Sequence, residues 1–303
     1  MADVFLLLCK ALKTESMDVN RLTELFGVYG AVSVGKLKNG HINETYIVEC
    51  KTGRYILQSI NRDVFEKPET IMRNISFIED VFASERRVTV PHFMKSGGRN
   101  YARYDGRIWR LYEYIESWDN YPNREYIHGF AVGTFMRVVN SGDFKFRNTI
   151  TGFHDFGDGM EIFKSLMPMR NIHGDTKSSN IIYSERPAVI DLDTAMYSFA
   201  MVDYGDMIRS LTTGGVNLDT IYQATKGFAD GLENMLTGAE INSLYYGIIL
   251  VIRELFRRYS NEHGFPNLTS GECAERAEQL VTQLGYIRRN EKAIIKIIGE
   301  CFE

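Results

Sequence analysis

The sequence NIHGDTKSSNIIYSERPAVIDLD, at residues 171–193, contains the pattern that decides the fold and points to a chemistry. Asp175 follows a His-Gly pair, and Asn180 stands five residues after it. A carboxylate on a loop can orient a hydroxyl group and accept its proton, and an amide oxygen can ligate Mg²⁺ beside carboxylates. The spacing therefore predicts a phosphotransfer site in which Asp175 faces the acceptor hydroxyl and Asn180 holds a metal ion.

Two short apolar runs, at 181–183 and 188–190, follow Asn180 and are separated by Ser-Glu-Arg-Pro. They predict a β-hairpin, which would return the chain and bring Asp191 beside Asn180. We expect Asp191 to be the main metal ligand. Asp193 is expected either to share the metal or to accept a hydrogen bond.

Lys177 lies two residues after Asp175, where its charge could neutralise a transferred phosphate. His173 is expected to hold the backbone of the loop. Each residue alone also has a structural interpretation, since Asp175 could be a helix cap or a turn residue and His173 a buried histidine. The joint pattern, H-G-D-x-x-x-x-N followed by a hairpin and I-D-x-D, favours the functional interpretation.

The composition limits the classes of protein to which the chain can belong. Its 303 residues, 44% of them hydrophobic, suffice for one large or two ordinary domains. A net charge of −4 without a dense Lys/Arg run argues against nucleic acid or an anionic membrane as partner. No apolar run approaches the ~20 residues of a membrane span, and the run at 4–9 favours a helix over a signal peptide because Asp3 precedes it. The four cysteines form no C-x-x-C pair, so we expect a cytoplasmic protein with reduced thiols.

Two textures divide the chain. Short β-prone runs dominate from about residue 28 to 115, around one helical run at 68–84 whose apolar residues recur three or four apart. The strands are expected at 31–37, 45–50, 54–60, 88–93, 101–104 and 108–115. Helices are expected at 127–139, 218–236, 239–259, 272–284 and 291–302.

The boundary is expected near 116–123, where Pro, Asn and Asp favour a linker. The fold class is therefore α+β. We expect a small β-rich N-terminal lobe (1–116) with one main helix, followed by a larger and mostly helical C-terminal lobe (117–303).

The joint pattern resembles the aminoglycoside phosphotransferase and small-molecule kinase family, which has a two-lobed protein-kinase-like fold. The resemblance covers most of the chain. Some segments are closer to N-acetylhexosamine 1-kinases: GHINETYIV at 40–48, YILQSIN at 55–61, HGDTKSSN at 173–180, VIDLDT at 189–194 and DYGDMIR at 203–209. The resemblance implies use of ATP and Mg²⁺, with Asp175 as the catalytic residue and Asn180 and Asp191 as Mg²⁺ ligands. It also implies that the N-terminal lobe binds the nucleotide and the C-terminal lobe contains the acceptor pocket.

The segment NGHINETY at 39–46 resembles the loop that covers ATP phosphates in these kinases. Gly40 would allow the backbone to approach a phosphate, and His41, Asn43 and Thr45 would donate hydrogen bonds. The segment lacks the repeated glycines of G-x-G-x-x-G and, read alone, is typical of an ordinary β-turn.

The other nucleotide contacts are expected on two strands. Glu113 and Ile115 would form the hinge, whose backbone pairs with adenine. Gln58 stands where kinase-like proteins usually carry a phosphate-binding lysine. Arg62 could substitute for that lysine. The N-acetylhexosamine kinases resemble this chain in having Gln at this position. Glu79 is a candidate for the glutamate that would pair with the lysine.

Asp203 and Asp206 precede an expected helical run at 207–211. A helix N-terminus favours carboxylates, so we expect a structural role for Asp206 there. The resemblance implies that one of the two carboxylates braces the catalytic loop, and Arg209 could pair with either.

The acceptor pocket is expected in the helical lobe near Asp175. Arg258 and Tyr259 resemble an Arg-aromatic segment that contacts the sugar in N-acetylhexosamine kinases. The alternative is a solvated helix face, since three arginines cluster there. His154 and Asp155 are further candidates for the pocket.

The expected activity is that of a phosphotransferase with an alcohol group as acceptor. The favoured reaction is that of a sugar kinase which phosphorylates the anomeric hydroxyl of an N-acetylhexosamine and gives the sugar 1-phosphate. One alternative is a kinase of an aminoglycoside, choline or another alcohol. An alternative of a different class is a nucleotide-binding pseudokinase acting as sensor or scaffold, for which Gln58 is the only support. The sequence leaves the acceptor, the choice of ATP or GTP and the oligomeric state open.

Overall fold

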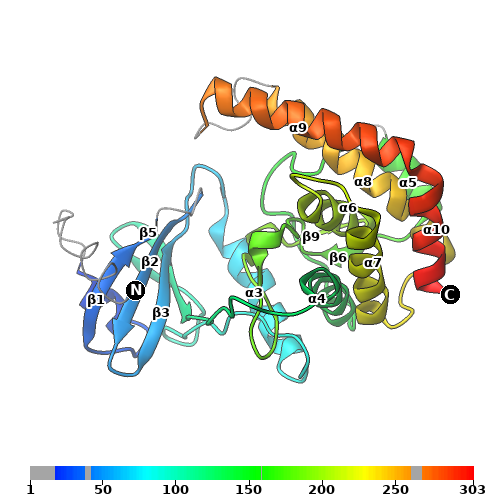
Figure 1. Ribbon diagram of the computed structural model, residues 1–303. Coiled ribbons are helices and arrows are strands. Elements are labelled where there is room, and N and C mark those ends of the chain that lie inside the picture. The colour runs from blue at the N-terminus through cyan, green and yellow to red at the C-terminus, as the bar shows by residue number, and fades with distance from the viewer. Residues whose placement is uncertain (1–17, 38–41, 158, 261–267) are drawn as a thin grey trace. The chain divides into compact units, whose positions relative to one another are not determined.

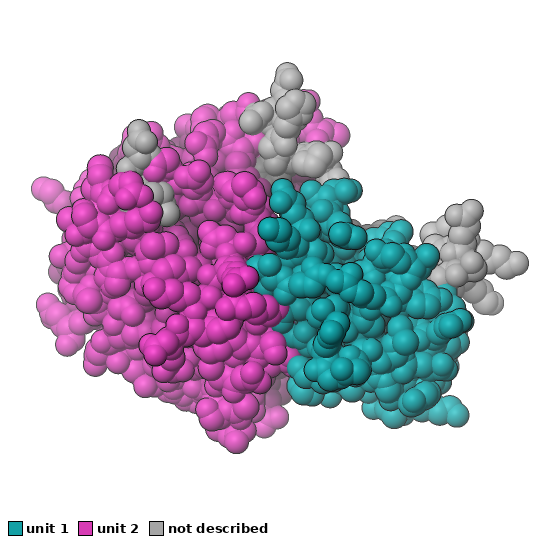
Figure 2. Space-filling model, turned by 180° about the vertical axis from the view of Figure 1, so that it is seen from behind, with its two compact units in different colours: residues 1–72, 91–115 teal, residues 73–90, 116–303 magenta. Residues whose placement is uncertain are grey.

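A computed structural model of the protein describes residues 18–37, 42–157, 159–260 and 268–303 (Figure 1). The helix expected at the N-terminus and the loop residues Gly40 and His41 lie outside the described residues. The chain forms two compact units, which Figure 2 distinguishes by colour. Unit 1 consists of residues 1–72 and 91–115, and unit 2 of residues 73–90 and 116–303.

Unit 1 is built around an antiparallel sheet of five strands in the order β1-β2-β3-β5-β4. The strands are β1 (Ala31–Lys36), β2 (Glu44–Cys50), β3 (Gly53–Ser59), β4 (Ala102–Tyr104) and β5 (Arg107–Glu113). A tight turn joins β2 to β3, and Gly53 adopts a φ of +146° there that residues with a side chain rarely adopt. The buried core of unit 1, formed by the sheet and helix α2 (Val19–Glu24), includes Leu22, Phe26, Val48, Leu57 and Trp109.

Helix α3 (Pro68–Phe82) contributes to both units, because the boundary between them falls within it. Proline suits its first position, where a backbone N–H has no partner inside the helix. Ile71, Ile75 and Ile78 are fully buried and lie on one face, as the apolar spacing predicts. The predicted helix is confirmed and ends two residues early.

Seven helices of the described ranges belong wholly to unit 2 (Figure 1). They are α4 (Arg124–Val139), α5 (Gly159–Leu166), α6 (Ala200–Leu211), α7 (Leu218–Leu232), α8 (Gly238–Tyr259), α9 (Ser270–Arg289) and α10 (Glu291–Phe302). None of the helices in the described ranges combines the length and the apolar character that a membrane span requires.

Two pairs of these helices approach so closely that glycine is required at their contacts. A Cβ atom on Gly129 of α4 would lie 2.0 Å from the carbonyl oxygen of Ala224 in α7. One on Gly205 of α6 would lie 2.3 Å from the carbonyl oxygen of Gly247 in α8. Helices α4, α6 and α8 each carry side chains of the site described below, so this close packing fixes the backbone from which those side chains project.

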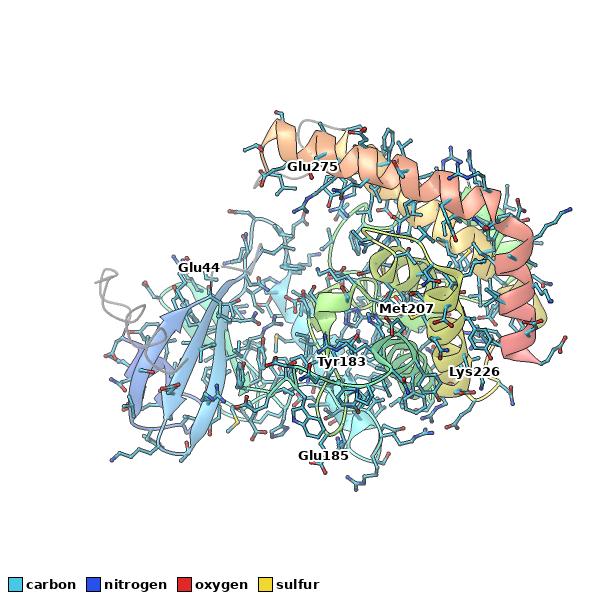
Figure 3. The ribbon with its side chains drawn as sticks, viewed as in Figure 1. Glu44, Tyr183, Glu185, Met207, Lys226 and Glu275 are labelled. Carbon is cyan, nitrogen blue, oxygen red and sulfur yellow. The ribbon has the colours of Figure 1, made fainter. Side chains whose placement is uncertain are left out.

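Two short strand pairs frame the 171–193 stretch. They are β6 (Arg170–Ile172) with β9 (Met196–Ser198), and β7 (Ile181–Ile182) with β8 (Ala188–Val189). Short 3₁₀ turns, η1 (Ser178–Asn180) and η2 (Leu192–Thr194), precede β7 and follow β8. The predicted hairpin is confirmed, and Tyr183 and Glu185, labelled in Figure 3, lie in its connection.

The α+β fold class is confirmed by the sheet of unit 1 and the helices of unit 2. Two local predictions are wrong. Residues 88–93 form only isolated bridges, at Thr89 and Phe93, since Pro91 removes a ladder hydrogen bond between them. The helix expected at 207–211 begins earlier, at Ala200, so the expected placement of Asp206 at a helix N-terminus is also wrong.

Candidate active site

The loop after β6 is held by the buried carboxylate of Asp203, which lies in the first turn of α6. Its two oxygens accept hydrogen bonds of 2.8 Å from the backbone N–H groups of His173 and Gly174. Burial raises the pKa of Asp203, and the two N–H donors oppose that rise. Asp203 is thus the carboxylate that braces the loop from behind.

Each of the four consecutive carbonyl groups of residues 173–176 accepts a hydrogen bond from a side chain. The contacts are Thr194 Oγ1 to His173 O (3.0 Å), His154 Nε2 to Gly174 O (2.7 Å), Asn180 Nδ2 to Asp175 O (2.8 Å) and His128 Nε2 to Thr176 O (2.8 Å). Gly174 is required within this loop, because its φ is +81° and a Cβ atom there would lie 2.6 Å from the Thr194 carbonyl oxygen. The backbone that carries Asp175 is therefore fixed from several elements at once.

The carboxylate of Asp175 has two side-chain partners. Its Oδ2 lies 2.5 Å from Lys177 Nζ and 3.0 Å from Asn180 Nδ2. Burial alone would lower the pKa of Lys177, but the charges of Asp175 and Asp191 outweigh that effect and raise it. The structure thus brings together a carboxylate, a protonated amine and an amide, with a second carboxylate near enough to act on the amine.

Asn180 and Asp191 fit a hard divalent cation such as Mg²⁺. The amide nitrogen of Asn180 is bonded to Asp175, which leaves its Oδ1 as the atom that would ligate a metal. The N–H of Ile190 donates to Asn180 O at 2.9 Å and brings Asp191 back to this position. Asp191 is exposed and has a left-handed backbone (φ 59°, ψ 55°), a strained conformation that often occurs at functional sites.

Asp193 is placed differently from Asp191. It is only 1% exposed and lies in η2, where its backbone oxygen accepts a hydrogen bond from Thr149. Within the described ranges, no group of three or more His, Cys, Asp or Glu side chains is arranged to hold a metal. An ion at Asn180 and Asp191 would therefore take further oxygen ligands from water or phosphate, as Mg²⁺ commonly does.

His173 stabilises the loop through its ring, whereas Arg209 has its ion-pair partner within α6. His173 Nδ1 accepts from the N–H of Asp175 at 3.2 Å, and its Nε2 lies 2.9 Å from Ile190 O. Arg209 pairs with Asp206 inside α6. Burial alone would lower the pKa of Arg209, but the charge of Asp206 raises it.

The three arginines near the end of α8 differ in their surroundings. Arg253 and Arg257 are exposed, as on a solvated helix face, whereas the guanidinium of Arg258 lies over the ring of Phe153 at 5.5 Å. The hydroxyl of Tyr259 accepts a hydrogen bond of 3.3 Å from Arg276 in α9. Arg258 therefore has a defined place beside the 148–155 loop.

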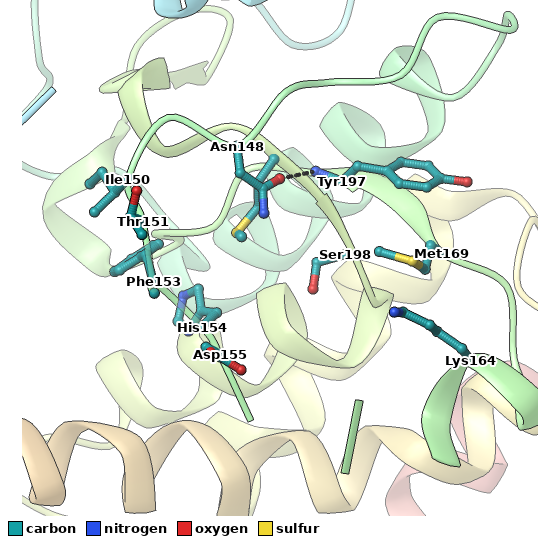
Figure 4. A pocket seen from close by; sticks show the side chains of 12 residues that line it. Asn148, Ile150, Thr151, Phe153, His154, Asp155, Lys164, Met169, Tyr197 and Ser198 are labelled. Carbon is teal, nitrogen blue, oxygen red and sulfur yellow. Dashed lines mark hydrogen bonds between the residues drawn. The ribbon is translucent and has the colours of Figure 1, made fainter. Parts of the chain in front are cut away.

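Residues of this loop line a pocket of about 350 Å³ in unit 2 (Figure 4). It is lined by residues 148 and 150–155 and by Lys164, Met169, Met196, Tyr197 and Ser198. The predicted pocket residues His154 and Asp155 are among them, but Asp175, Arg258 and Tyr259 are not. The buried hydroxyl of Ser198 finds no hydrogen-bond partner in the described part of the chain.

In unit 1 three polar side chains form a row across neighbouring strands. Gln58 Nε2 donates to Thr45 Oγ1, and Arg110 Nε donates to Gln58 Oε1, each at 2.9 Å. These residues are direct partners in the β2–β3 and β3–β5 registers. Arg110 is only 2% exposed, so a buried cation stands beside the position of the missing lysine, whereas Arg62 is exposed.

The other predicted nucleotide-binding residues of the described ranges lie at the ends of strands or in a loop. Asn43 Oδ1 accepts a hydrogen bond of 3.0 Å from the N–H of Asn61. Glu113 is exposed at the end of β5, where its N–H donates to His92 O at 3.3 Å. Ile115 is half-buried at the end of unit 1.

Sequence reasoning missed three residues of these networks, Arg110, His128 and Glu254, and it did not predict the contact of His154 with the loop. Arg110 had a usable signal, since it stands between the large apolar residues Trp109 and Leu111 of a strand. His128 and Glu254 had none, because the partner of each lies far away in the sequence: Thr176 for His128 and His154 for Glu254.

A segment of the chain that contains part of this site matches a known protein family. The sequence model of the phosphotransferase enzyme family matches residues 153–236, a segment that includes the whole 171–193 stretch. The structure of a microcompartment-associated aminopropanol kinase is 15% identical, with a TM-score of 0.67, and the match covers 91% of this chain and 98% of that one.

Two further solved structures share the fold. An aminoglycoside phosphotransferase from Alicyclobacillus acidocaldarius subsp. acidocaldarius DSM 446 is 11% identical with a TM-score of 0.67, covering 97% of this chain and 99% of that one. A spectinomycin phosphotransferase in complex with ADP and spectinomycin is 11% identical with a TM-score of 0.59, covering 88% and 95%. The resemblance read from the sequence is therefore confirmed: the chain has the fold of the aminoglycoside phosphotransferases and small-molecule kinases, and its residues 153–236 match the phosphotransferase enzyme family.

Proposed function

We propose that the protein is an ATP- and Mg²⁺-dependent phosphotransferase that phosphorylates the anomeric hydroxyl of an N-acetylhexosamine. The observation that carries the phosphotransfer is the placement of Asp175 between Lys177 and Asn180 on a loop fixed by buried side chains. The fold supports it, because an aminopropanol kinase and a spectinomycin phosphotransferase share that fold.

In the proposed reaction the acceptor oxygen attacks the terminal phosphorus of ATP, its proton passes to Asp175, and ADP leaves with the electron pair of the broken P–O bond. Lys177, 2.5 Å from Asp175, orients the carboxylate and offsets negative charge on the transferred group. Bound Mg²⁺ would neutralise phosphate charge, and Asn180 and Asp191 are the residues that would hold it.

We assign nucleotide binding to unit 1, where Gly40, His41, Asn43, Glu113 and Ile115 stay as predictions. Gln58 and Thr45 are already hydrogen-bonded to each other within the sheet. We infer that Arg110 supplies, through Gln58, the positive charge that a strand lysine would otherwise provide.

The N-acetylhexosamine acceptor is proposed from the likeness of five sequence segments, and Arg258 beside Phe153 is the side chain assigned to its acetamido group. The test is ADP release with ATP, Mg²⁺ and a panel of acceptors: N-acetylglucosamine, N-acetylgalactosamine, aminoglycosides, choline and amino alcohols. We expect the strongest signal with an N-acetylhexosamine, and ³¹P NMR of the product should place the phosphate on the anomeric carbon. A signal confined to another alcohol would reject the sugar and keep the phosphotransferase.

A further inference from the structure

His154 lies between two groups that can only accept hydrogen bonds. Its Nδ1 is 2.6 Å from Glu254 Oε2, and its Nε2 is 2.7 Å from the carbonyl oxygen of Gly174. Burial alone would raise the pKa of Glu254, but its hydrogen bond to His154 lowers that pKa and favours the ionised carboxylate. An ionised carboxylate and a carbonyl carry no proton to donate, so both ring nitrogens donate, which requires the imidazolium form. His154 and Glu254 are each only 6% exposed, so this charged pair is buried.

A second histidine, His128 of α4, contacts the same loop but is neutral. His128 Nε2 lies 2.8 Å from Thr176 O, and its buried Nδ1 has no hydrogen-bond partner among the residues that the structure describes. Burial lowers the pKa of His128 to about 4. For His154, burial would also lower the pKa, but the hydrogen bond and the charge of Glu254 raise it. The loop is thus held by a neutral histidine at Thr176 and a charged one at Gly174.

Glu254 also fixes the backbone of His154. Its Oε1 accepts the backbone N–H of His154 at 3.1 Å, while its Oε2 takes the ring. His154 has a φ of +51°, which residues other than glycine adopt only where the surroundings impose it. One carboxylate on α8 therefore sets both the conformation and the ring orientation of His154.

We propose that His154 and Glu254 form a charged positioning pair that fixes the Gly174 carbonyl and thereby directs Asp175 at its acceptor, for as long as the imidazolium keeps its proton. This inference rests on the proposed phosphotransfer. Loss of that proton would leave one of two buried acceptors without a donor, which is costly in a dry environment. The loop would then lose its side-chain contact directly before Asp175.

Charged residues lie on the elements next to this pair, among them Asp155, Lys164, Asp206 and Arg258. Asp206 of α6 favours the protonated imidazolium, and Arg258 of α8 favours the ionised carboxylate of Glu254. Asp155, next in the chain, is exposed and accepts a hydrogen bond from the N–H of Gly157 at 2.9 Å. Lys164 lines the same pocket as His154 and pairs with Glu161. Asp206 and Arg258 therefore both favour the charged form of the pair.

The first test is the pH dependence of turnover in Glu254→Gln, with Arg253→Gln, an exposed neighbour on the same helix, as the matched control. The glutamine can still accept from the ring but carries no charge. We expect turnover of Glu254→Gln to decline at a pH lower by at least ~1 unit than in the wild type, with KM for ATP unchanged. Arg253→Gln should overlay the wild type. A Glu254→Gln profile that also overlays the wild type contradicts the proposal.

The second test measures the protons directly. In ¹⁵N NMR of histidine-labelled protein at pH 7, both ring nitrogens of His154 should carry hydrogen and only one of His128 should. In Glu254→Gln the second proton of His154 should be lost. A singly protonated His154 in the wild type overturns the proposal, and this readout needs no turnover. Absence of phosphotransfer to every acceptor would therefore refute the proposed function separately.

A third variant, His154→Asn, keeps a residue that tolerates positive φ but is too short to reach Gly174. We expect turnover to fall by ~10- to 100-fold with KM for ATP little changed, as for a misplaced catalytic group. Circular dichroism should verify that the variant folds. Turnover of a folded variant within twofold of the wild type contradicts the proposal, and if the variant does not fold, the Glu254→Gln profile and the NMR spectrum decide.

Discussion

The proposed catalytic loop of unit 2 and the polar row of unit 1 differ in how they place their key side chain. In the loop the proposed proton acceptor, Asp175, lies on a backbone whose carbonyl groups accept hydrogen bonds from His154, Asn180 and His128. In the row the expected lysine is absent, and a buried cation, Arg110, reaches the same place only through Gln58. The loop thus positions a carboxylate that the local sequence supplies, whereas the row places one buried charge on β5 beside the neutral side chains of Gln58 and Thr45.

This difference predicts that the two regions fail in different ways. Changes at Asp175 should slow the chemical step while the fold stays intact, because Asp203, His154 and His128 hold the loop backbone independently of that carboxylate. Changes in the row should affect nucleotide affinity and, since Arg110 is buried, stability as well.

The largest effect is expected from Asp175→Asn, which removes the proton acceptor and keeps the shape. Turnover should fall by at least ~100-fold, the low end for the loss of a positioned acid or base. Steady-state kinetics and circular dichroism measure it, with Asp143→Asn, at an exposed residue outside the site, as the control. Near-normal turnover would remove Asp175 from the chemistry.

A smaller effect is expected from Arg110→Gln. Loss of the charge should weaken ATP binding by ~10-fold, in the range of a hydrogen bond to a charged group, whereas Arg110→Lys should retain part of the affinity. Calorimetric titration with ATP checks this, and thermal unfolding shows whether each variant is folded. Wild-type affinity in folded Arg110→Gln would leave the row without a role in nucleotide binding.

The smallest effect concerns stability alone. The pKa of His128 is about 4 in the folded protein, against ~6.5 in an unfolded chain. As pH falls below ~6.5, the unfolded state therefore takes up a proton that the folded state does not. The free energy of unfolding should fall by up to about 3 kcal/mol between pH 6.5 and 4 from this residue. Denaturant titrations of wild type and His128→Gln across that range measure the difference, and parallel curves would contradict it.

The same contrast explains what sequence alone could predict. The 171–193 motif is local, so its loop, hairpin and the meeting of Asn180 with Asp191 follow from spacing. Arg110 and Gln58 are 52 residues apart, and only the register of the sheet brings them together. Glu254 lies 100 residues from His154, and no pattern on α8 separates it from an ordinary helix residue. The start of α6 was missed because its first residues, Ala200 to Val202, are apolar and carry no N-terminal cap signal.

The central claim is that this protein transfers phosphate to a small-molecule alcohol through Asp175. The most direct measurement is transfer of the γ-phosphate of labelled ATP to an acceptor in the presence of Mg²⁺, in wild type and Asp175→Asn. Label should appear in the acceptor with the wild type, and at least ~100-fold less label should appear with the variant. ATP binding without label in any alcohol would contradict it and indicate a nucleotide-binding protein without phosphotransfer.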